Sequence, residues 1–300
     1  MLNNVLHEGE YLSFKVIRII SINEESFYVV ESPYKTRHML DSEKYKNYNL
    51  LPDSNITCRV DKINCSGKIF LEPLNPYYKE YQEYDFVITS IDDVYGRAGQ
   101  KLSVATLLGE NRFYAKMPLN KADNYYINQK ISAIVIQIKQ ANILVFDKSD
   151  TTKQFSKLND TIDIRVDKLD NENESKYVLS DIKGNLHIVK YENYKSYNLS
   201  VGKNIKAKIK GFYYDGSYSL EPEHPYFREN QKQYFVFIKK TRIYKNNTHW
   251  HNEIVVKDDK GLQWNVAPYT EDLVDAFENG ITLFKIDQIR KGLLIISPIL

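Results

Sequence analysis

The chain contains Leu71-Glu72-Pro73-Leu74-Asn75-Pro76-Tyr77, and 149 positions later it contains Leu220-Glu221-Pro222-Glu223-His224-Pro225-Tyr226. The likeness continues on both sides of this motif. Residues 28–86 align with residues 177–235 without a gap, and 20 of the 59 aligned positions are identical. A match of this length within one chain indicates an internal duplication. The sequence therefore predicts two halves with the same architecture.

The residues around this motif predict short β-strands in both copies. Apolar and polar residues alternate there, and β-branched and aromatic residues are frequent, as is typical of strands with one buried face. Residues 45–50 predict a short helix or turn, and residues 64–67 predict a turn before a last strand. Five strands with an insertion between the third and fourth are the order of a small OB barrel. The predicted strands are 11–20, 26–30, 37–40, 56–63 and 68–73 in the first copy, and 162–166, 176–179, 186–189, 205–209 and 218–220 in the second.

Two more strand-rich stretches follow the copies and align loosely with each other at an offset of 150. They cover 84–148 and 233–300, and each ends in a predicted pair of strands. We therefore expect an all-β fold class of tandem small five-stranded OB-like barrels, in which a two-barrel unit is duplicated. The expected domains are 1–76, 77–150, 151–225 and 226–300.

The connections between the barrels differ in character. Segments 73–86 and 222–235 each contain two prolines and an adjacent aromatic pair. Proline restricts the backbone and aromatic rings need a packing surface, so both segments predict an ordered joint within a half. Segment 147–159 is more polar and is the expected hinge between the halves.

The composition limits the classes of partner. The chain has 41 basic and 39 acidic residues, for a net charge of +2. This balance argues against a strongly basic coat, which tight nonspecific binding to duplex DNA normally needs. Cys58 and Cys65 predict two free thiols, because a lone pair at this spacing forms neither a disulfide framework nor a zinc site. The sequence shows no signal peptide and no apolar run of membrane-spanning length, so we expect a cytoplasmic protein without membrane contact.

Several features of the two copies match a known repeat. They are an aromatic residue in the second strand, a turn that ends in histidine, a lead into the fourth strand, and a last strand that begins at glycine. The aromatic residues are Tyr28 and Tyr177, and the turns are Lys35-Thr36-Arg37-His38 and Gly184-Asn185-Leu186-His187. The lead into the fourth strand is residues 201–209, and the last strands are residues 67–71 and 216–220. With these features the two stretches, under half of the chain, resemble the S-one-type RNA-binding repeat of ribosomal and RNA-processing proteins. That repeat is an OB barrel shared with cold-shock proteins, so the resemblance implies OB barrels at 1–76 and 151–225.

The resemblance also directs attention to residues that could bind nucleic acid. Barrels of this type stack bases on aromatic rings while lysine and arginine contact phosphates. The candidates in the first barrel are Tyr28, Tyr34, Lys35, Arg37 and His38, and those in the third barrel are Tyr177, His187 and Lys190. For each tyrosine a place in a barrel core is the alternative, and for the two histidines it is a hydrogen bond at a strand end.

The second barrel adds a different pattern. Arg112, Tyr114 and Lys116 alternate with other residues, which would place them on one face of a strand. Such a basic and aromatic face suits a nucleic-acid strand, although solvated strands also show it. In the fourth barrel, His249-Trp250-His251 would place two imidazoles on one face, but two ligands without a nearby acid make a poor metal site. Trp250 is more typical of an exposed stacking or partner-anchoring ring.

The sequence contains no motif for catalysis. A phosphate-binding loop, a nucleophile elbow and a His-Glu-x-x-His helix are all absent from it. We therefore expect no enzyme, no cofactor and no metal. The first hypothesis is a noncatalytic protein that binds single-stranded RNA or DNA, with RNA favoured, and senses it or presents it to a protein partner.

The alternative hypothesis is an adaptor or regulatory subunit whose OB barrels bind another protein. The balanced charge and the abundance of tyrosine favour it, because protein interfaces are enriched in aromatic residues and long basic stripes are missing here. The two hypotheses differ in their dependence on salt. Nucleic-acid binding weakens steeply as salt is added, whereas an aromatic protein interface responds little.

Overall fold

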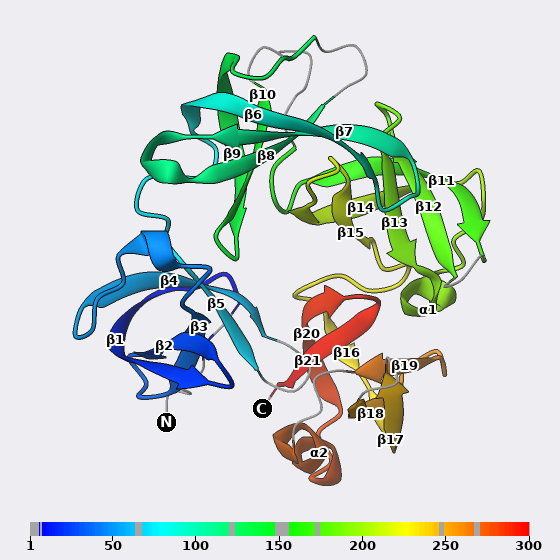
Figure 1. The fold of residues 1–300 in the computed structure, drawn as a ribbon. Helices are drawn as coiled ribbons and strands as arrows, with labels where there is room; N and C mark the ends of the chain where they lie inside the picture. The colour runs from blue at the N-terminus through cyan, green and yellow to red at the C-terminus, as the bar shows by residue number, and fades with distance from the viewer. Residues whose placement is uncertain are drawn as a thin grey trace. The chain divides into compact units, whose positions relative to one another are not determined.

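The computed structural model describes residues 6, 8–63, 68–119, 124–147, 156–171, 175–245, 249–266 and 271–299. Of residues 242–245, 249–253, 271 and 272 it describes only the backbone. Almost all regular structure in these residues is β-strand, arranged in four sheets (Figure 1). The predicted all-β class, built of repeated small five-stranded sheets, is confirmed. The chain forms two compact units: residues 1–64, 68–155 and 212–216 form the first, and residues 65–67, 156–211 and 217–300 form the second.

The first sheet contains the five strands that the sequence predicts. Its order is β3-β2-β1-β4-β5. The segment between the third and fourth strands contains a short 3-10 helix, η1 (Lys46–Tyr48), as the prediction of a helix or turn allowed. The strands are β1 (Tyr11–Ile22), β2 (Glu25–Glu31), β3 (Arg37–Asp41), β4 (Asn55–Ile63) and β5 (Ile69–Pro73). The turn predicted at residues 64–67, which includes Cys65, lies outside the described residues.

The second sheet is a closed barrel of order β10-β8-β7-β6-β9. The parallel pairing of β8 with β10 closes it, while all other pairs in it are antiparallel. A short 3-10 helix, η2 (Glu110–Arg112), precedes β8. The strands are β6 (Glu83–Tyr95), β7 (Lys101–Leu108), β8 (Tyr114–Leu119), β9 (Lys130–Lys139) and β10 (Asn142–Asp147).

The third sheet repeats the order of the first, β13-β12-β11-β14-β15. Its insertion after the third strand is α1 (Tyr191–Tyr194) followed by η3 (Lys195–Tyr197), so it occupies the same place as η1. The strands are β11 (Thr161–Asp170), β12 (Lys176–Asp181), β13 (Leu186–Lys190), β14 (Asn204–Phe212) and β15 (Tyr218–Pro222).

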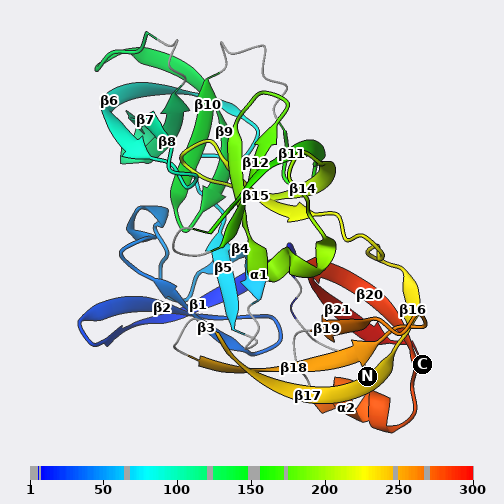
Figure 2. The same ribbon diagram turned by 90° about the vertical axis from the view of Figure 1, so that its right-hand side faces the viewer.

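The fourth sheet has six strands in the order β16-β20-β21-β19-β18-β17. Its first strand is divided at Phe235 into β16 (Lys232–Tyr234) and β17 (Val236–Lys245), which explains the extra strand. Figure 2 shows β17 and β18 as a long antiparallel pair at one edge of this sheet. The other elements are β18 (His249–Lys257), β19 (Gln263–Val266), α2 (Glu271–Glu278), β20 (Leu283–Arg290) and β21 (Leu293–Pro298).

A β-bulge in the first strand is common to all four sheets. It lies between Val16 and Arg18, Ile88 and Ser90, Val166 and Lys168, and Phe237 and Lys239. A bulge bends a strand and increases its twist. The early part of each first strand can therefore pair with the fourth strand of its sheet, while the later part pairs with the second strand. This shared device lets a short sheet curl, and the second sheet closes into a barrel.

A buried carboxylate connects the first two sheets. Glu72, at the end of β5, is 4% exposed, yet it accepts hydrogen bonds from the backbone N–H groups of Gln140 and Ala141 in the β9–β10 turn. The hydroxyl of Tyr45 donates a further bond to it at 3.2 Å. Burial raises the pKa of Glu72 to about 7, although these donors oppose the rise. The motif that revealed the duplication therefore contains the residue that links two barrels.

The second unit contains the same link. Glu221, the equivalent of Glu72, accepts bonds from the N–H groups of Lys291 at 2.6 Å and Gly292 at 3.1 Å, in the β20–β21 turn. Burial also raises the pKa of this carboxyl. A second acid strengthens each joint: Glu80 pairs with Arg59 at 3.2 Å, and Glu229 pairs with Lys208 at 2.9 Å. Each joint therefore uses two carboxylates, one in the last strand before the joint and one in the connecting segment.

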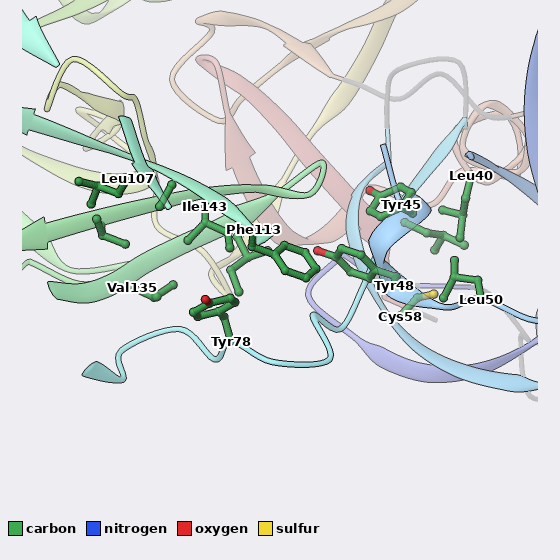
Figure 3. Packing of buried hydrophobic residues seen from close by; sticks show 14 of the residues in the cluster. Leu40, Tyr45, Tyr48, Leu50, Cys58, Tyr78, Leu107, Phe113, Val135 and Ile143 are labelled. Carbon is green, nitrogen blue, oxygen red and sulfur yellow. The ribbon is translucent and has the colours of Figure 1, made fainter. Parts of the chain in front are cut away.

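Aromatic rings fill the space beside each carboxylate. In the first unit Phe113 lies 5.8 Å from both Tyr48 and Tyr78, as measured between ring centroids (Figure 3). One hydrophobic cluster runs through both sheets of this unit. In the second unit Trp264 takes the place of Phe113 and lies 5.1 Å from Phe227. The packing surface expected for the aromatic pairs of segments 73–86 and 222–235 is therefore present.

The tightness of the second joint can be tested with two glycines. Gly292 has a φ of +73°, and a Cβ atom there would lie 2.0 Å from the carbonyl oxygen of Asn193. Gly280 has a similar φ of +79°, but a Cβ there would meet nothing within 4 Å. Both alanine variants bear the cost of a left-handed backbone. We expect Gly292→Ala to lower the free energy of unfolding by about 2 kcal/mol more than Gly280→Ala, because only the first creates a clash.

Urea unfolding followed by tryptophan fluorescence measures this difference. Both tryptophans of the chain, Trp250 and Trp264, belong to the second unit, so the signal reports on that unit. Equal losses in the two variants would contradict the close approach of the β20–β21 turn to α1.

Candidate nucleic-acid interface

The register of the first sheet separates its two faces. Arg18, Val29 and Met39 are directly opposite one another on neighbouring strands, and so are Ile19, Tyr28 and Leu40. Residues that are opposite on adjacent strands share a face. Tyr28 is 8% exposed and Leu40 is 3% exposed, so these two side chains of the second set face the core. In the first set Arg18 and Met39 are exposed, whereas Val29 between them is 7% exposed. Tyr28 is a core residue, and its ring offers no free face to a base.

The third sheet gives the same result. Tyr177 pairs with Val189 on the core face and is 4% exposed. The next row is Lys168, Val178 and Ile188, which matches Arg18, Val29 and Met39 in character, and Val178 in its middle is 3% exposed. The aromatic that resembles the RNA-binding repeat is therefore in the core of both sheets. For Tyr28 and Tyr177 the structure therefore agrees with the alternative interpretation, a ring in the core, and not with a ring that stacks on a base.

His187 is also buried, with no measurable exposure. Its Nδ1 accepts a hydrogen bond from the N–H of Tyr218 at 2.8 Å, and its Nε2 lies 3.4 Å from the carboxylate of Asp181. Asp181 in turn accepts bonds from the N–H groups of Lys183 and Asn185 in the β12–β13 turn. Burial opposes ionisation of Asp181, but the bonds from His187 and Asn185 outweigh it and lower its pKa. His187 thus connects the turn to the fifth strand of its barrel.

The turn between the second and third strands has a similar design in three sheets. A polar side chain accepts hydrogen bonds from the backbone of the turn, and an aromatic side chain follows it six positions later. In the first sheet Ser32 Oγ accepts bonds from the N–H groups of Tyr34 and Thr36, and Thr36 Oγ1 lies 2.9 Å from His38 Nε2. In the fourth sheet Asp258 holds its turn in the same way and accepts a bond from Trp264 Nε1 at 2.9 Å. His38 is half-buried, and burial lowers its pKa. The strand-end hydrogen bond is therefore the structural role of both His38 and His187.

The remaining candidates of the first barrel surround the β2–β3 turn. Tyr34 is half-buried and packs against the core. Lys35 and Arg37 are exposed, but both pair with Glu31, at 3.0 Å and 3.6 Å. The hydrogen bond from Lys35 is the main reason that the pKa of Glu31 is lowered. These two cations share one carboxylate, which compensates part of their charge.

The second barrel presents the strongest basic and aromatic face. Tyr114 is 60% exposed on β8, and Lys116 is exposed on the same side, because Ala115 and Met117 between them point into the core. Arg112 is exposed at the end of η2, directly ahead of the strand and not within it. Lys116 donates a hydrogen bond to Thr106 on the neighbouring strand at 2.6 Å. Within the described part of the chain, neither Arg112 nor Lys116 forms an ion pair.

Other candidates are placed less fully. Lys190 is exposed at the end of β13. The side chains of His249, Trp250 and His251 lie outside the described part of the structure, although their backbone belongs to β18. Cys58 is a buried free thiol, and burial raises its pKa. Over the described ranges, the structure has no cluster of three metal-ligating side chains and no helix long and apolar enough to cross a membrane.

Two exposed rings were not among the sequence candidates. Tyr77 is 41% exposed and Tyr226 is 46% exposed, and both belong to the repeated joint motif. The duplication itself was the signal that could have identified them, since both copies keep this tyrosine. Comparisons with known proteins add no further guide: no protein-family model and no curated protein matches this sequence.

Proposed function

We propose that this chain is a noncatalytic protein that binds single-stranded nucleic acid, with RNA favoured over DNA. The observation that supports this most is the face of the second barrel, where Tyr114 and Lys116 are exposed on one side of β8 and Arg112 is exposed shortly before the strand. The second and third strands of OB barrels form their oligonucleotide-binding face. Tyr114 and Lys116 lie on the third strand of a closed five-stranded barrel.

The chemistry of this face suits a flexible strand. A base stacked on an aromatic ring contributes about 1–3 kcal/mol, and any base can stack, because each has a π-face. Arg112 and Lys116 have no protein carboxylate to neutralise them among the described residues, so they can contact phosphates on either side of the stacked base. The preference for RNA rests on the resemblance of two other barrels to an RNA-binding repeat.

The first and third sheets would add weaker contacts. In each of these sheets one row has a cation at one end and an apolar residue at the other, with a buried valine between them: Arg18 and Met39 in the first sheet, and Lys168 and Ile188 in the third. The long stems of arginine and lysine can cover apolar surface while the charged head stays in water. Several weak sites on one chain raise the effective concentration of each other, so the whole chain binds more tightly than any barrel. Such a protein would sense a strand or present it to a catalytic partner.

Replacing Tyr114 with alanine tests this function. We expect Tyr114→Ala to weaken binding of a fluorescein-labelled single-stranded RNA about tenfold, the effect of losing one stacked base. The matched control is Tyr126→Ala, which removes a ring that is 65% exposed in the same unit and lies on no strand of the barrel. Fluorescence anisotropy at low and moderate salt, with single-stranded DNA and duplex DNA as further probes, gives the affinities.

Salt dependence separates the proposed function from its alternative. Each phosphate contact in a single strand contributes a slope of about −0.7 in log K against log salt, and Lys116→Ala should reduce the total slope by about that amount. An adaptor remains the second candidate, because the cations Lys35 and Arg37 are already paired with Glu31. Absence of binding to every probe at tens of micromolar protein would contradict the nucleic-acid function.

A further inference from the structure

The two joint tyrosines differ from the aromatic residues that follow them. Tyr77 and Tyr226 are about half exposed, whereas the next residues, Tyr78 and Phe227, are each 3% exposed. The buried residue of each pair supplies the packing between barrels. The exposed residue is not needed to fill that core, and yet both joints present a ring to solvent at this position.

Hydrogen bonds hold the backbone of each ring in place. In the first joint Asn75 Oδ1 accepts bonds from the N–H groups of Tyr77 and Tyr78, both at 2.9 Å. In the second joint His224 takes the place of asparagine, and its Nδ1 accepts bonds from Tyr226 at 3.2 Å and Phe227 at 3.1 Å. Burial and the nearby Arg228 lower the pKa of His224 to about 4, so the ring stays neutral and Nδ1 remains an acceptor.

Each exposed ring also rests on a buried aromatic residue. Tyr77 lies 5.6 Å from Phe113 and Tyr226 lies 5.5 Å from Trp264, and both ring pairs are inclined at 60°. Phe113 and Trp264 are 5% and 7% exposed, so one side of each tyrosine is fixed against the protein. A ring held in one orientation loses little conformational entropy on binding, which favours its use as a contact.

Basic residues are close to both rings, in the chain for Tyr77 and in space for Tyr226. Tyr77 contacts Phe113, and the neighbours of Phe113 in the chain, Arg112 and Tyr114, belong to the face proposed to bind nucleic acid. The ammonium group of Lys260 lies 6.0 Å from the centre of the Tyr226 ring. A cation next to an exposed ring is the combination that grips a base and its phosphate together.

We infer that Tyr77 and Tyr226 are base-stacking platforms, one at each joint, for a single-stranded nucleic acid that runs from a barrel face onto the joint. This inference rests on the proposed function and adds two binding residues to it. In the first unit the same nucleic-acid strand contacts Tyr114 and then Tyr77, the ring that packs against Phe113. The rigid connection between barrels then has a second use, because it keeps the joint ring in a fixed place.

Substitutions at Tyr77 separate stacking from packing. Tyr77→Phe keeps the ring, and Tyr77→Leu keeps an apolar cover over Phe113 but removes the aromatic face. We expect Tyr77→Phe to bind single-stranded RNA with unchanged affinity and Tyr77→Leu to bind about tenfold more weakly, with the same pair of results at Tyr226. Thermal unfolding of each variant shows whether the fold is intact.

A photochemical experiment on the wild-type chain gives an independent readout. An oligouridine of about 16 nucleotides, a length at the upper end of the site size of one OB fold, is prepared with 5-iodouridine in place of uridine. Irradiation joins this base to an aromatic ring stacked on it, and mass spectrometry identifies the residue. The expected adducts are on Tyr77 and Tyr226, in addition to Tyr114 from the proposed function, with Tyr126 unmodified as the internal control.

The outcomes distinguish the inference from the function on which it rests. If Tyr114→Ala weakens binding while Tyr77→Leu and Tyr226→Leu do not, and neither tyrosine forms an adduct, the inference is overturned and the proposed function stands. If the wild-type chain binds no probe, both fail. Weaker binding by both leucine variants at unchanged thermal stability, together with adducts on both rings, supports the inference.

Discussion

Replacement of His187 by alanine is expected to lower the free energy of unfolding of the second unit by about 3 kcal/mol. The side chain is fully buried and joins the N–H of Tyr218 to the carboxylate of Asp181. Its removal leaves both groups without this partner and opens a cavity, and each of these losses costs about 1–3 kcal/mol. The fold of the third barrel depends on this bond because it connects the β12–β13 turn to β15.

His38→Ala is the matched control for this variant. His38 occupies the same position in the first copy, but it is only half-buried, and it hydrogen-bonds to Thr36 two residues away. We expect it to cost about 1 kcal/mol, the net value of a single hydrogen bond. Urea unfolding measures both variants, by tryptophan fluorescence for the second unit and by circular dichroism for the chain. A loss of less than 1 kcal/mol in His187→Ala would contradict the role of this residue.

The joint in the first unit is expected to weaken as the pH rises from about 4.5 to about 7. The pKa of Glu72 is raised from 4.5 to about 7 in the folded chain, mainly by burial. The native state therefore binds a proton more tightly than the unfolded state, and protonation stabilises it. The contribution of protonated Glu72 to the free energy of unfolding is complete below pH 4.5, decreases as the pH rises, and is lost above about pH 7. A shift of this size corresponds to about 3 kcal/mol.

Hydrogen exchange locates this effect. The amides of Gln140 and Ala141, which donate to Glu72, should exchange faster at pH 8 than at pH 5 after correction for the intrinsic rate. The control is Glu72→Gln, which keeps the shape of the side chain but cannot titrate. In this variant the amides of Gln140 and Ala141 should be less protected at both pH values. Their exchange rates, after correction for the intrinsic rate, should not differ between pH 5 and pH 8. The same pH dependence in this variant would exclude Glu72 as its source.

The repeated motif was sufficient to predict much of the architecture. Alternation of apolar and polar residues placed all five strands of the first and third sheets, because a strand with one buried face must alternate. The alignment of the two stretches that follow the copies predicted the closing strand pairs, which are β9 with β10 and β20 with β21. The split of the first strand at Phe235 carried no such signal, since residues 234–238 form one unbroken apolar run across it.

The candidate site was less predictable than the fold. The pattern around Tyr114 and Lys116 indicated one exposed face, and both side chains are exposed there. Tyr28 and Tyr177 had the same apparent suitability but are buried. Their direction depends on pairing register and on the bulge in the first strand. A shift of one residue moves a side chain to the opposite face of a sheet, and short-range pattern does not encode that shift.

The sequence by itself determined that this protein is a duplicated all-β chain, because identity between copies and strand periodicity can both be read from the order of the residues. Only the tertiary structure decided what the motif does. Glu72 and its donors Gln140 and Ala141 are 68 and 69 positions apart, and no spacing rule connects them. The exposure of Tyr77 beside the buried Tyr78 was decided in the same way. Burial is a property of the packed chain, and it depends on which distant surfaces the fold brings together.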